Sequence, residues 1–416
     1  MERQTRRRYL RAAGAVAAGL VAGCSTATPA RNRSTVGDDS APSEVAETQF
    51  RGGLDRRGVY PGRSVPASVT VDWELPEVNT GDHTAAKASP VAIESGDVVV
   101  PGDTGRVHRV TPSGEVRWTA DTEESTRGIH GTPAVANGAV YVGAYDGALY
   151  AFDLETGERV WRRQLGDAVG SSPGYHDGTV YIAVEYYDPS GGMFGVDAVT
   201  GDVEWVDRRP TDHPHSTCAI DRDVGRLVVG SNDGDLYAWS YPDMSFQWIF
   251  ETGEEIKGPV ATYDGGAFFG SWDDHVYRVS LDDGREEWAV ETGGSVMSGP
   301  SVEPSTGTLY VGSHDSELYA LDVDSGDERW TFDTGGKLLG CPTVTAGHVL
   351  VGSYDRRLYA VEKETGDGVW SVGADGWVTS TPLVTGDAVY FTARASKDSL
   401  ADGDGPTGSL YRLVEA

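Results

Sequence analysis

The chain has 416 residues, of which 38% are hydrophobic and 9% aromatic, so it is long enough to bury a large core. Asp and Glu total 64 against 34 Lys and Arg, which gives a formal net charge of −30 and excludes the basic surface that nucleic-acid binding requires. A large excess of hydrated carboxylates is tolerated where salt screens their repulsion, so the composition predicts a halophilic surface.

The first 23 residues predict an export signal rather than part of the fold. Arg6 and Arg7 precede an apolar run at 12–23, which is too short to span a bilayer. The arginine pair resembles a twin-arginine signal, and residues 20–24 (Leu-Val-Ala-Gly-Cys) resemble the cleavage box of secreted lipoproteins. We expect lipid on Cys24 to anchor the mature protein at the extracytoplasmic face of the cell membrane. An ordinary signal peptide with an incidental cysteine is the alternative.

Residues 24–48 are predicted to form a disordered tether. They are mostly Ser, Thr, Ala, Pro, Asp and Glu, with too few large apolar side chains to offset the entropy of ordering. The tether contains the sequon Asn32-Arg33-Ser34, a candidate glycosylation site. Removal of residues 1–23, which carry five Arg and one Glu, changes the formal charge from −30 to −30 − 4 = −34.

A unit of about forty residues then repeats, and its clearest copy is 131–161. Asn137-Gly138, Asp146-Gly147 and Thr156-Gly157 separate four short runs rich in Val, Tyr and aromatic residues. Glycine takes the positive φ that tight turns require, and runs of this length suit strands rather than helices. The pattern therefore predicts a four-stranded antiparallel meander.

The repeat count predicts an all-β, eight-bladed β-propeller over residues 49–416. The opening strand occurs eight times, whereas the chain ends after the third strand of the last unit. A lone segment around Trp73 precedes the first unit, so we expect this N-terminal strand to complete the last blade and close the ring. An open solenoid is the alternative, but it would have no use for that strand. The repeat tryptophans are Trp73, Trp118, Trp161, Trp205, Trp248, Trp288, Trp330 and Trp370.

Residues 151–161 have the form Ala-x-Asp-x-x-Thr-Gly-x-x-x-Trp, and 320–330 and 360–370 follow it with Ser325 and Glu362 as substitutions. This form resembles the tryptophan-docking repeat of quinoprotein alcohol dehydrogenase-like (PQQ-repeat) propellers, over about residues 49–413. The resemblance implies that the tryptophans lock each blade to its neighbour. The segment 49–60 also resembles the lead-in that precedes many such propellers.

The same resemblance raises the possibility of catalysis. Dehydrogenases of this family hold pyrroloquinoline quinone (PQQ) over calcium and would need adjacent cysteines, clustered metal ligands and an aspartate base. No two cysteines are adjacent here, and Cys218 and Cys341 are expected to be unpaired buried thiols. We therefore expect no cofactor and no metal. PQQ with calcium is the alternative.

Binding is predicted on the rim that carries the connections from second to third strand and from one blade to the next. Two of these connections are expanded, at 185–192 and 393–408. Lys257 occupies a repeat position that holds a small residue in the other seven blades. Its charge either lines the channel or lies at an edge that reaches solvent, and the second interpretation is favoured. His213 and His215 lack a third ligand for a metal. The candidate rim residues are Arg127, His130, Glu185, Tyr186, Tyr187, Asp188, Lys257, Lys337 and Trp377.

These features predict a monomeric, membrane-tethered extracytoplasmic propeller that binds a protein or envelope partner without catalysis. The layout is also similar to that of the propeller lipoproteins of the bacterial outer-membrane assembly machine. A PQQ-dependent quinoprotein dehydrogenase, or a PQQ-binding protein without turnover, is the alternative function. A sensor or transporter-associated binding domain is a third class.

Overall fold

The computed structural model describes residues 48–80, 88–123, 127–395 and 408–416, all within one compact unit, Glu44–Ala416. Arg6, Arg7, Cys24, Asn32, the tether up to residue 47 and most of the 393–408 insertion lie outside the described residues. Within the described part of the chain, no helix is both long enough and apolar enough to cross a membrane.

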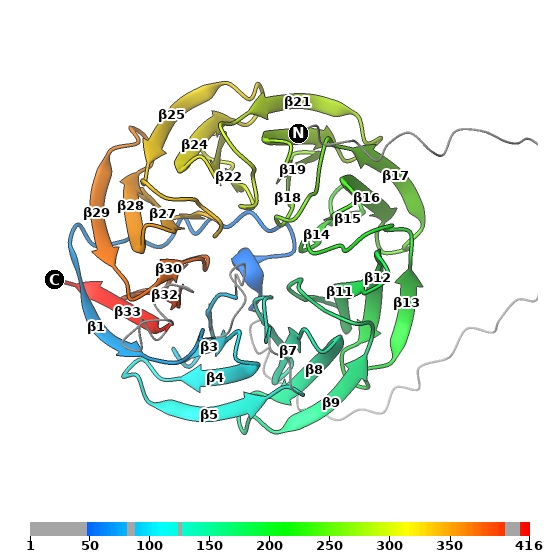
Figure 1. Ribbon diagram of the computed structural model, residues 1–416, viewed down its shortest axis with the longest axis horizontal. Coiled ribbons are helices and arrows are strands. Elements are labelled where there is room, and N and C mark those ends of the chain that lie inside the picture. Colours follow the sequence, from blue (N-terminus) through cyan, green and yellow to red (C-terminus); the bar gives the residue numbers. More distant parts are fainter. Residues whose placement is uncertain (1–47, 81–87, 124–126, 396–407) are drawn as a thin grey trace, which may run out of the picture. The chain divides into compact units, whose positions relative to one another are not determined.

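Eight antiparallel sheets surround a central channel, which confirms the predicted eight-bladed propeller (Figure 1). In each of the first seven blades, four consecutive strands follow one another from the channel outwards. Blades one to four are β2 (Val91–Ala92), β3 (Val98–Pro101), β4 (Arg106–Val110), β5 (Val116–Asp121); β6 (Ala134–Ala136), β7 (Ala139–Gly143), β8 (Ala148–Asp153), β9 (Arg159–Gln164); β10 (Gly174–His176), β11 (Thr179–Tyr186), β12 (Ser190–Asp197), β13 (Val203–Asp207); and β14 (Ala219–Asp221), β15 (Arg226–Gly230), β16 (Asp235–Ser240), β17 (Phe246–Glu251).

Blades five to seven repeat this order: β18 (Ala261–Tyr263), β19 (Gly266–Gly270), β20 (His275–Ser280), β21 (Glu286–Glu291); β22 (Ser301–Glu303), β23 (Thr308–Gly312), β24 (Glu317–Asp322), β25 (Glu328–Asp333); and β26 (Thr343–Val344), β27 (His348–Ser353), β28 (Arg357–Glu362), β29 (Gly368–Gly373). Blade eight has β31 (Leu383–Val384), β32 (Val389–Arg394) and β33 (Leu410–Glu415), and the short β30 (Trp377–Val378) also pairs with β32.

The N-terminal strand closes the ring as predicted. β1 (Val69–Leu75) pairs antiparallel with β33, with Val71 opposite Leu413 and Glu74 opposite Tyr411. The first strand of the propeller is therefore the outermost strand of its last blade. Because both ends of the ring meet in one sheet, blade eight has a complete set of four strands.

The core lies between the blades. Val99 and Val107 of blade one form one buried cluster with Val140 and Val142 of blade two, and similar clusters join each later pair of neighbours. A four-stranded sheet buries both faces only against such neighbours, so no blade is stable alone.

Most repeat tryptophans dock on the glycine turn of the next blade. Trp330 donates its indole N–H to the carbonyl of Lys363 at 3.1 Å, and its ring covers Gly366. Gly366 has a φ of +80°, and an added Cβ would lie 2.8 Å from the indole. The same arrangement is found for Trp73, Trp118, Trp161, Trp248 and Trp288.

Two tryptophans differ from this pattern. Trp370 donates to the carbonyl of Pro66 at 2.9 Å, because the N-terminal segment replaces a following turn. Trp205 faces a turn of blade four that lacks the Thr-Gly pair, and it packs edge-on against Trp239 with ring centroids 5.8 Å apart. Loss of the glycine in one blade is thus accompanied by a second tryptophan beside the first.

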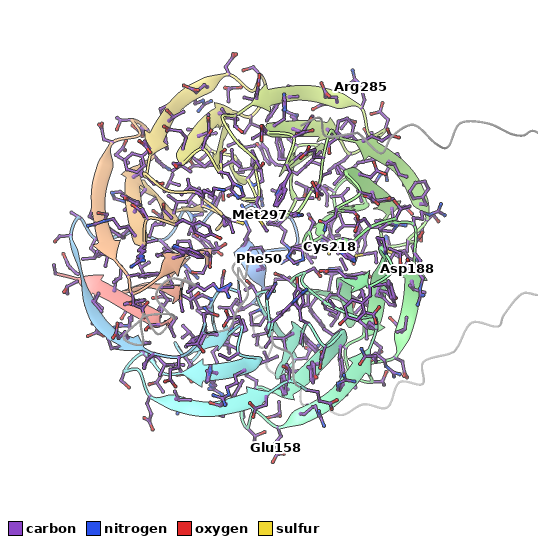
Figure 2. The ribbon with its side chains drawn as sticks, viewed as in Figure 1. Phe50, Glu158, Asp188, Cys218, Arg285 and Met297 are labelled. Atoms are coloured by element: carbon purple, nitrogen blue, oxygen red, sulfur yellow. The ribbon has the colours of Figure 1, made fainter. Side chains whose placement is uncertain are left out.

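Residues 48–63, which we call the N-terminal strap, run around the inside of the channel before the chain reaches β1. The strap makes hydrogen bonds to the first strand of blades two to eight, through Val135, Tyr175, Ile220, Thr262, Val302, Val344 and Val384. Its short 3-10 helix η1 (Phe50–Gly52) lies near the channel axis, where Figure 2 shows Phe50. The sequence indicated only a lead-in here.

Arg56 fixes the strap between blades three and four. Its side chain is fully buried and donates to the carbonyls of Cys218 at 3.1 Å, Phe50 at 2.8 Å and Pro173 at 3.3 Å. Burial lowers the pKa of Arg56, and the nearby Cys218 and Asp55 oppose that shift. Cys218 and Cys341 are both buried and unpaired, as predicted.

Replacing the docking glycine tests the contribution of this contact to stability. Gly366→Ala should reduce the free energy of unfolding by about 1–3 kcal/mol, because alanine is strained at positive φ and its Cβ collides with Trp330. Denaturant unfolding monitored by tryptophan fluorescence measures the change. Gly347→Ala is the control, since a Cβ there meets nothing within 4 Å. Equal losses in both variants would contradict a specific docking role.

Candidate functional site at the channel mouth

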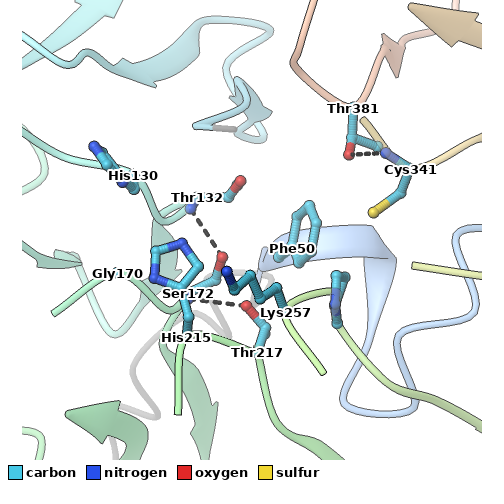
Figure 3. A pocket seen from close by; sticks show the side chains of 11 residues that line it. Phe50, His130, Thr132, Gly170, Ser172, His215, Thr217, Lys257, Cys341 and Thr381 are labelled. Carbon is cyan, nitrogen blue, oxygen red and sulfur yellow. Dashed lines mark hydrogen bonds between the residues drawn. The ribbon is translucent and has the colours of Figure 1, made fainter. Parts of the chain in front are cut away.

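The channel is nearly filled on the side where the blade-to-blade connections enter. The Phe50 ring lies among residues that immediately precede the first strands, and Figure 3 shows it beside Lys257. The remaining cavity is about 20 Å³, enough for about one water molecule. Its lining includes His130, Thr132, His215, Thr217 and Cys341. The mouth is therefore a surface with a shallow centre rather than a deep pocket.

A buried carboxyl–imidazole pair lies beside this cavity. Glu185, at the end of β11, accepts a hydrogen bond from Nδ1 of His215 at 2.9 Å when that nitrogen is protonated, and both side chains are less than a tenth exposed. The Tyr145 hydroxyl is 3.3 Å from the same nitrogen, and the His130 ring packs on Tyr145 with centroids 4.0 Å apart. The Arg127 guanidinium lies 5.7 Å from the Tyr145 ring centre. Blades two and three are thus joined through aromatic and charged groups.

The environment shifts the pKa values of this group. Burial by itself would raise the pKa of Glu185, but the adjacent His215 outweighs that effect and holds the pKa below its usual value. Burial raises the pKa of Tyr145 well above its usual range, Glu185 adds to this rise, and Arg127 opposes it. Near neutral pH the carboxyl is therefore ionised and the phenol protonated.

Lys257 is partly exposed and lines the cavity beside Phe50, which is the less favoured of the two sequence interpretations. Its ammonium lies 3.5 Å from the centre of the Trp272 ring and 3.8 Å from a carboxylate oxygen of Glu255. Only 18% of its side chain is exposed. Burial lowers the pKa of Lys257, whereas Glu255 and Glu185 favour the charged form.

Lys337 and Trp377 belong to a separate group on blades seven and eight. Trp377 stacks on Tyr354 with ring centroids 4.7 Å apart, and the Tyr354 amide donates to the carbonyl of Lys337 at 3.0 Å. Burial raises the pKa of Tyr354 to about 12, against the opposing charge of Arg394. Arg394 itself forms a fully buried ion pair with Asp103 of blade one at 2.8 Å. The Lys337 side chain is exposed.

The predicted 185–192 insertion is a longer hairpin rather than a loop. β11 and β12 pair without interruption from Thr179–Asp197 to Tyr186–Ser190, because residues 185, 186 and 190–192 continue the ladder. Beneath the hairpin, Nε2 of His213 is 2.7 Å from the Tyr186 carbonyl. Tyr187 at the tip is 78% exposed, whereas Glu185 is 6% exposed and cannot meet a partner directly.

Sequence reasoning missed several residues of the mouth. Tyr145, Trp272 and Tyr354 each stand directly before the Asp of a turn between second and third strands. That Asp accepts a hydrogen bond from a tyrosine four residues later, as in the 2.8 Å contact from Tyr277 to Asp273. An alignment of the repeats on this Asp would have found the variable aromatic position. Phe50 lies outside the repeat, so no comparison of blades could have placed it.

The described residues do not fit a quinone held over calcium at this mouth. The cavity of about 20 Å³ between Phe50 and Lys257 is too small for a tricyclic cofactor. A larger pocket that Phe50 also lines, of about 280 Å³, has no carboxylate in its lining to hold calcium. Over residues 48–80, 88–123, 127–395 and 408–416, no group of three or more His, Cys, Asp or Glu side chains is placed to hold a metal ion. Asp103 at the rim is already paired with Arg394.

Eight four-stranded blades with docked tryptophans define a PQQ-repeat, quinoprotein-like β-propeller. The family model described as "Outer membrane protein assembly factor BamB" matches residues 68–224, 215–332 and 314–411. The chain belongs to this family.

Comparisons with individual proteins agree with that assignment. The outer membrane protein assembly factor BamB of Yersinia pestis is 24% identical over 253 residues, which are 54% of this chain and 61% of that protein. The match thus spans about three-fifths of this curated relative. Two solved structures share the fold: quinohemoprotein alcohol dehydrogenase from Comamonas testosteroni (TM-score 0.74, 16% identity, 88% of this chain and 80% of that one) and BamB from Moraxella catarrhalis (0.65, 15%, 83% and 100%).

The Glu185–His215 pair predicts a measurable acid sensitivity. A carboxyl with a depressed folded-state pKa adds stability above its usual pKa of 4.5 and loses it as the pH falls through the lower, folded value. Glu185→Gln should therefore flatten the decline of Tm below about pH 4.5. Thermal unfolding across pH measures this, with Glu158→Gln at an exposed turn as control. Parallel profiles for wild type and Glu185→Gln would contradict the role of the pair.

Proposed function

We propose that this chain is a non-catalytic, protein-binding scaffold of the cell envelope, tethered to the membrane by lipid on Cys24 after twin-arginine export. Membership of the BamB family supports the general class. The observation that carries the proposal is the mouth itself. Between Phe50 and Lys257 the mouth keeps a cavity of only about 20 Å³, while the β11–β12 hairpin raises an exposed Tyr187 above the rim.

The rim has the features of a contact surface. Exposed tyrosine contributes a large, rigid contact area at low entropic cost, and Arg and Trp side chains are enriched in the centres of interfaces. Arg208 lies 4.9 Å from the Tyr186 ring and, with His213, supports the hairpin from below. The hairpin therefore presents Tyr187 and Asp188 from a rigid base, which reduces the cost of ordering on binding.

The tether is tested by removing its lipid-bearing residue. In cells of the source organism, Cys24→Ser should move the protein from the membrane fraction to the medium, since no other anchor is proposed. Fractionation and immunoblotting measure the distribution. Arg6→Lys with Arg7→Lys is the matched test of export and should leave the precursor inside the cell. Membrane retention of Cys24→Ser would contradict the lipid anchor.

The binding surface is tested by crosslinking from one position on each rim. A photoreactive phenylalanine at Tyr187 should crosslink a defined envelope protein in intact cells, and a second substitution, Asp188→Arg, should reduce that product. The control is the same photoreactive residue at Glu158, which lies in a turn at the opposite end of its blade. Equal crosslinking from both positions would contradict a binding rim at the hairpin.

A PQQ-dependent dehydrogenase is the second candidate, and two observations favour it: the likeness in fold to the Comamonas enzyme, and sequence matches to quinoprotein dehydrogenases over about 30% of this chain. Titration of the full chain with PQQ and calcium, followed by dye-linked alcohol oxidation, decides between the two. Saturable quinone binding with turnover would replace the scaffold proposal.

A further inference from the structure

The N-terminal strap leaves a gap at blade one. It makes hydrogen bonds to the first strands of blades two to eight, but among the described residues it makes none to β2. A pocket of about 280 Å³ lies at this gap, between the two ends of the strap and the first strands of blades eight, one and two. We call it the strap-gap pocket. Its size is near the lower end of the range for small-ligand sites, roughly 300–1,000 Å³.

The lining of the strap-gap pocket is cationic and apolar. In a chain with 64 acidic residues, the lining contains no Asp or Glu, but it contains Arg51 and Arg63. Phe50, Val91 and Leu383 supply apolar surface, and Tyr60 lies at the strap's far end. This combination matches a small molecule with one anionic end and an apolar body, because guanidinium groups recognise carboxylates and buried apolar surface favours association.

Arg63 is placed to contact such an anion. Its Nη1 donates to the Val384 carbonyl, and its guanidinium lies 4.8 Å from the centre of the Tyr60 ring. No carboxylate of the described residues pairs with it, and its side chain is half-buried. The contact to Val384 fixes one edge of the guanidinium, so the remaining N–H groups are held in place for a ligand.

Arg51 adds a second positive charge without a carboxylate partner. Its Nη2 donates to the Pro300 carbonyl and to Ser301 Oγ, the latter at 2.7 Å. Its Nε and Nη1 are buried and have no hydrogen-bond partner in the described part of the chain. The residue is 4% exposed and holds a φ of +61°. These contacts direct the guanidinium to blade six, so Arg51 would favour an anion in the pocket through its charge rather than by contact.

The positive charges of the strap act on Tyr60, which lines the pocket. Burial raises the pKa of Tyr60, and the charges of Arg63, Arg51 and Arg56 each act in the opposite direction. Arg57 differs, since it is paired with Asp55 at 2.6 Å and does not line the strap-gap pocket.

We propose that the strap-gap pocket binds a small organic monocarboxylate, with Arg63 contacting the carboxylate and Phe50, Val91 and Leu383 contacting the apolar body. This site shares Phe50 with the mouth but does not include the β11–β12 hairpin, so its test does not depend on the proposed binding rim. The ligand bridges the two ends of the strap and blade one, so its binding completes the ring of contacts inside the channel.

The probe is sodium benzoate, with benzamide as its neutral isostere and inorganic phosphate as an anion without an apolar body. Isothermal titration calorimetry of the full chain, at constant ionic strength set by sodium chloride, measures each Kd. We expect saturable benzoate binding, with benzamide and phosphate each weaker by about tenfold or more. Failure of benzoate to bind, or phosphate binding as tight as benzoate binding, would overturn the proposal.

Variants locate the site. Arg63→Gln should weaken benzoate binding by about tenfold or more, and Arg63→Lys, which keeps the charge but loses the oriented guanidinium, should bind with an intermediate Kd. Arg57→Gln removes the same charge from the same strap and should bind as wild type does. Thermal unfolding without ligand shows that each variant is folded. Unchanged binding in Arg63→Gln, or an equal loss in Arg57→Gln, would overturn the assignment, because binding would then not depend on this pocket.

Discussion

The structure depends on the need of each blade to cover two apolar faces. A four-stranded sheet of about forty residues cannot bury both of them, so each face packs on a neighbour and the series closes on itself. The indole contact with the next blade's turn, as between Trp330 and Gly366, fixes the spacing of adjacent sheets at their outer edge. Phe268 and Trp288 show how the rest of the interface continues inwards, with ring centroids 6.1 Å apart.

The N-terminal segment has two structural roles, one inside the channel and one at the outer edge of blade eight. Residues 48–63 bind the inner strands of seven blades, and the same segment then continues outwards to become β1 of blade eight. One stretch of chain therefore connects the channel to the outer edge of the ring. As a consequence Phe50 fills the channel, and the mouth above it has the form of a surface rather than a pocket.

Charge is divided between the outside and the channel. The acidic residues give the chain its net charge of −30, whereas cations accumulate where the strap passes through the interior. Arg56 is satisfied by three carbonyls and Lys257 by an aromatic face and Glu255. Arg51 and Arg63 line the strap-gap pocket, whose lining contains no carboxylate.

The sequence by itself determined the blades, their number and the closure by β1. The blades follow from local sequence, because turn glycines and short apolar runs recur within each unit of about forty residues. The unpaired strand around Trp73 favoured a closed ring over an open solenoid. The docking of a repeat tryptophan, such as Trp330, on a turn glycine could likewise be predicted from the spacing within the repeat.

Only the tertiary structure decided which residues meet in the channel. Glu185 and His215 are 30 residues apart, and Arg394 and Asp103 belong to the last and first blades of the chain, so no local pattern records their contacts. The orientation of the Lys257 side chain depended on Trp272, which lies in the second turn of the same blade. The path of the strap depended on all seven inner strands at once, because hydrogen bonds of an irregular segment are fixed only when its partners are already in place.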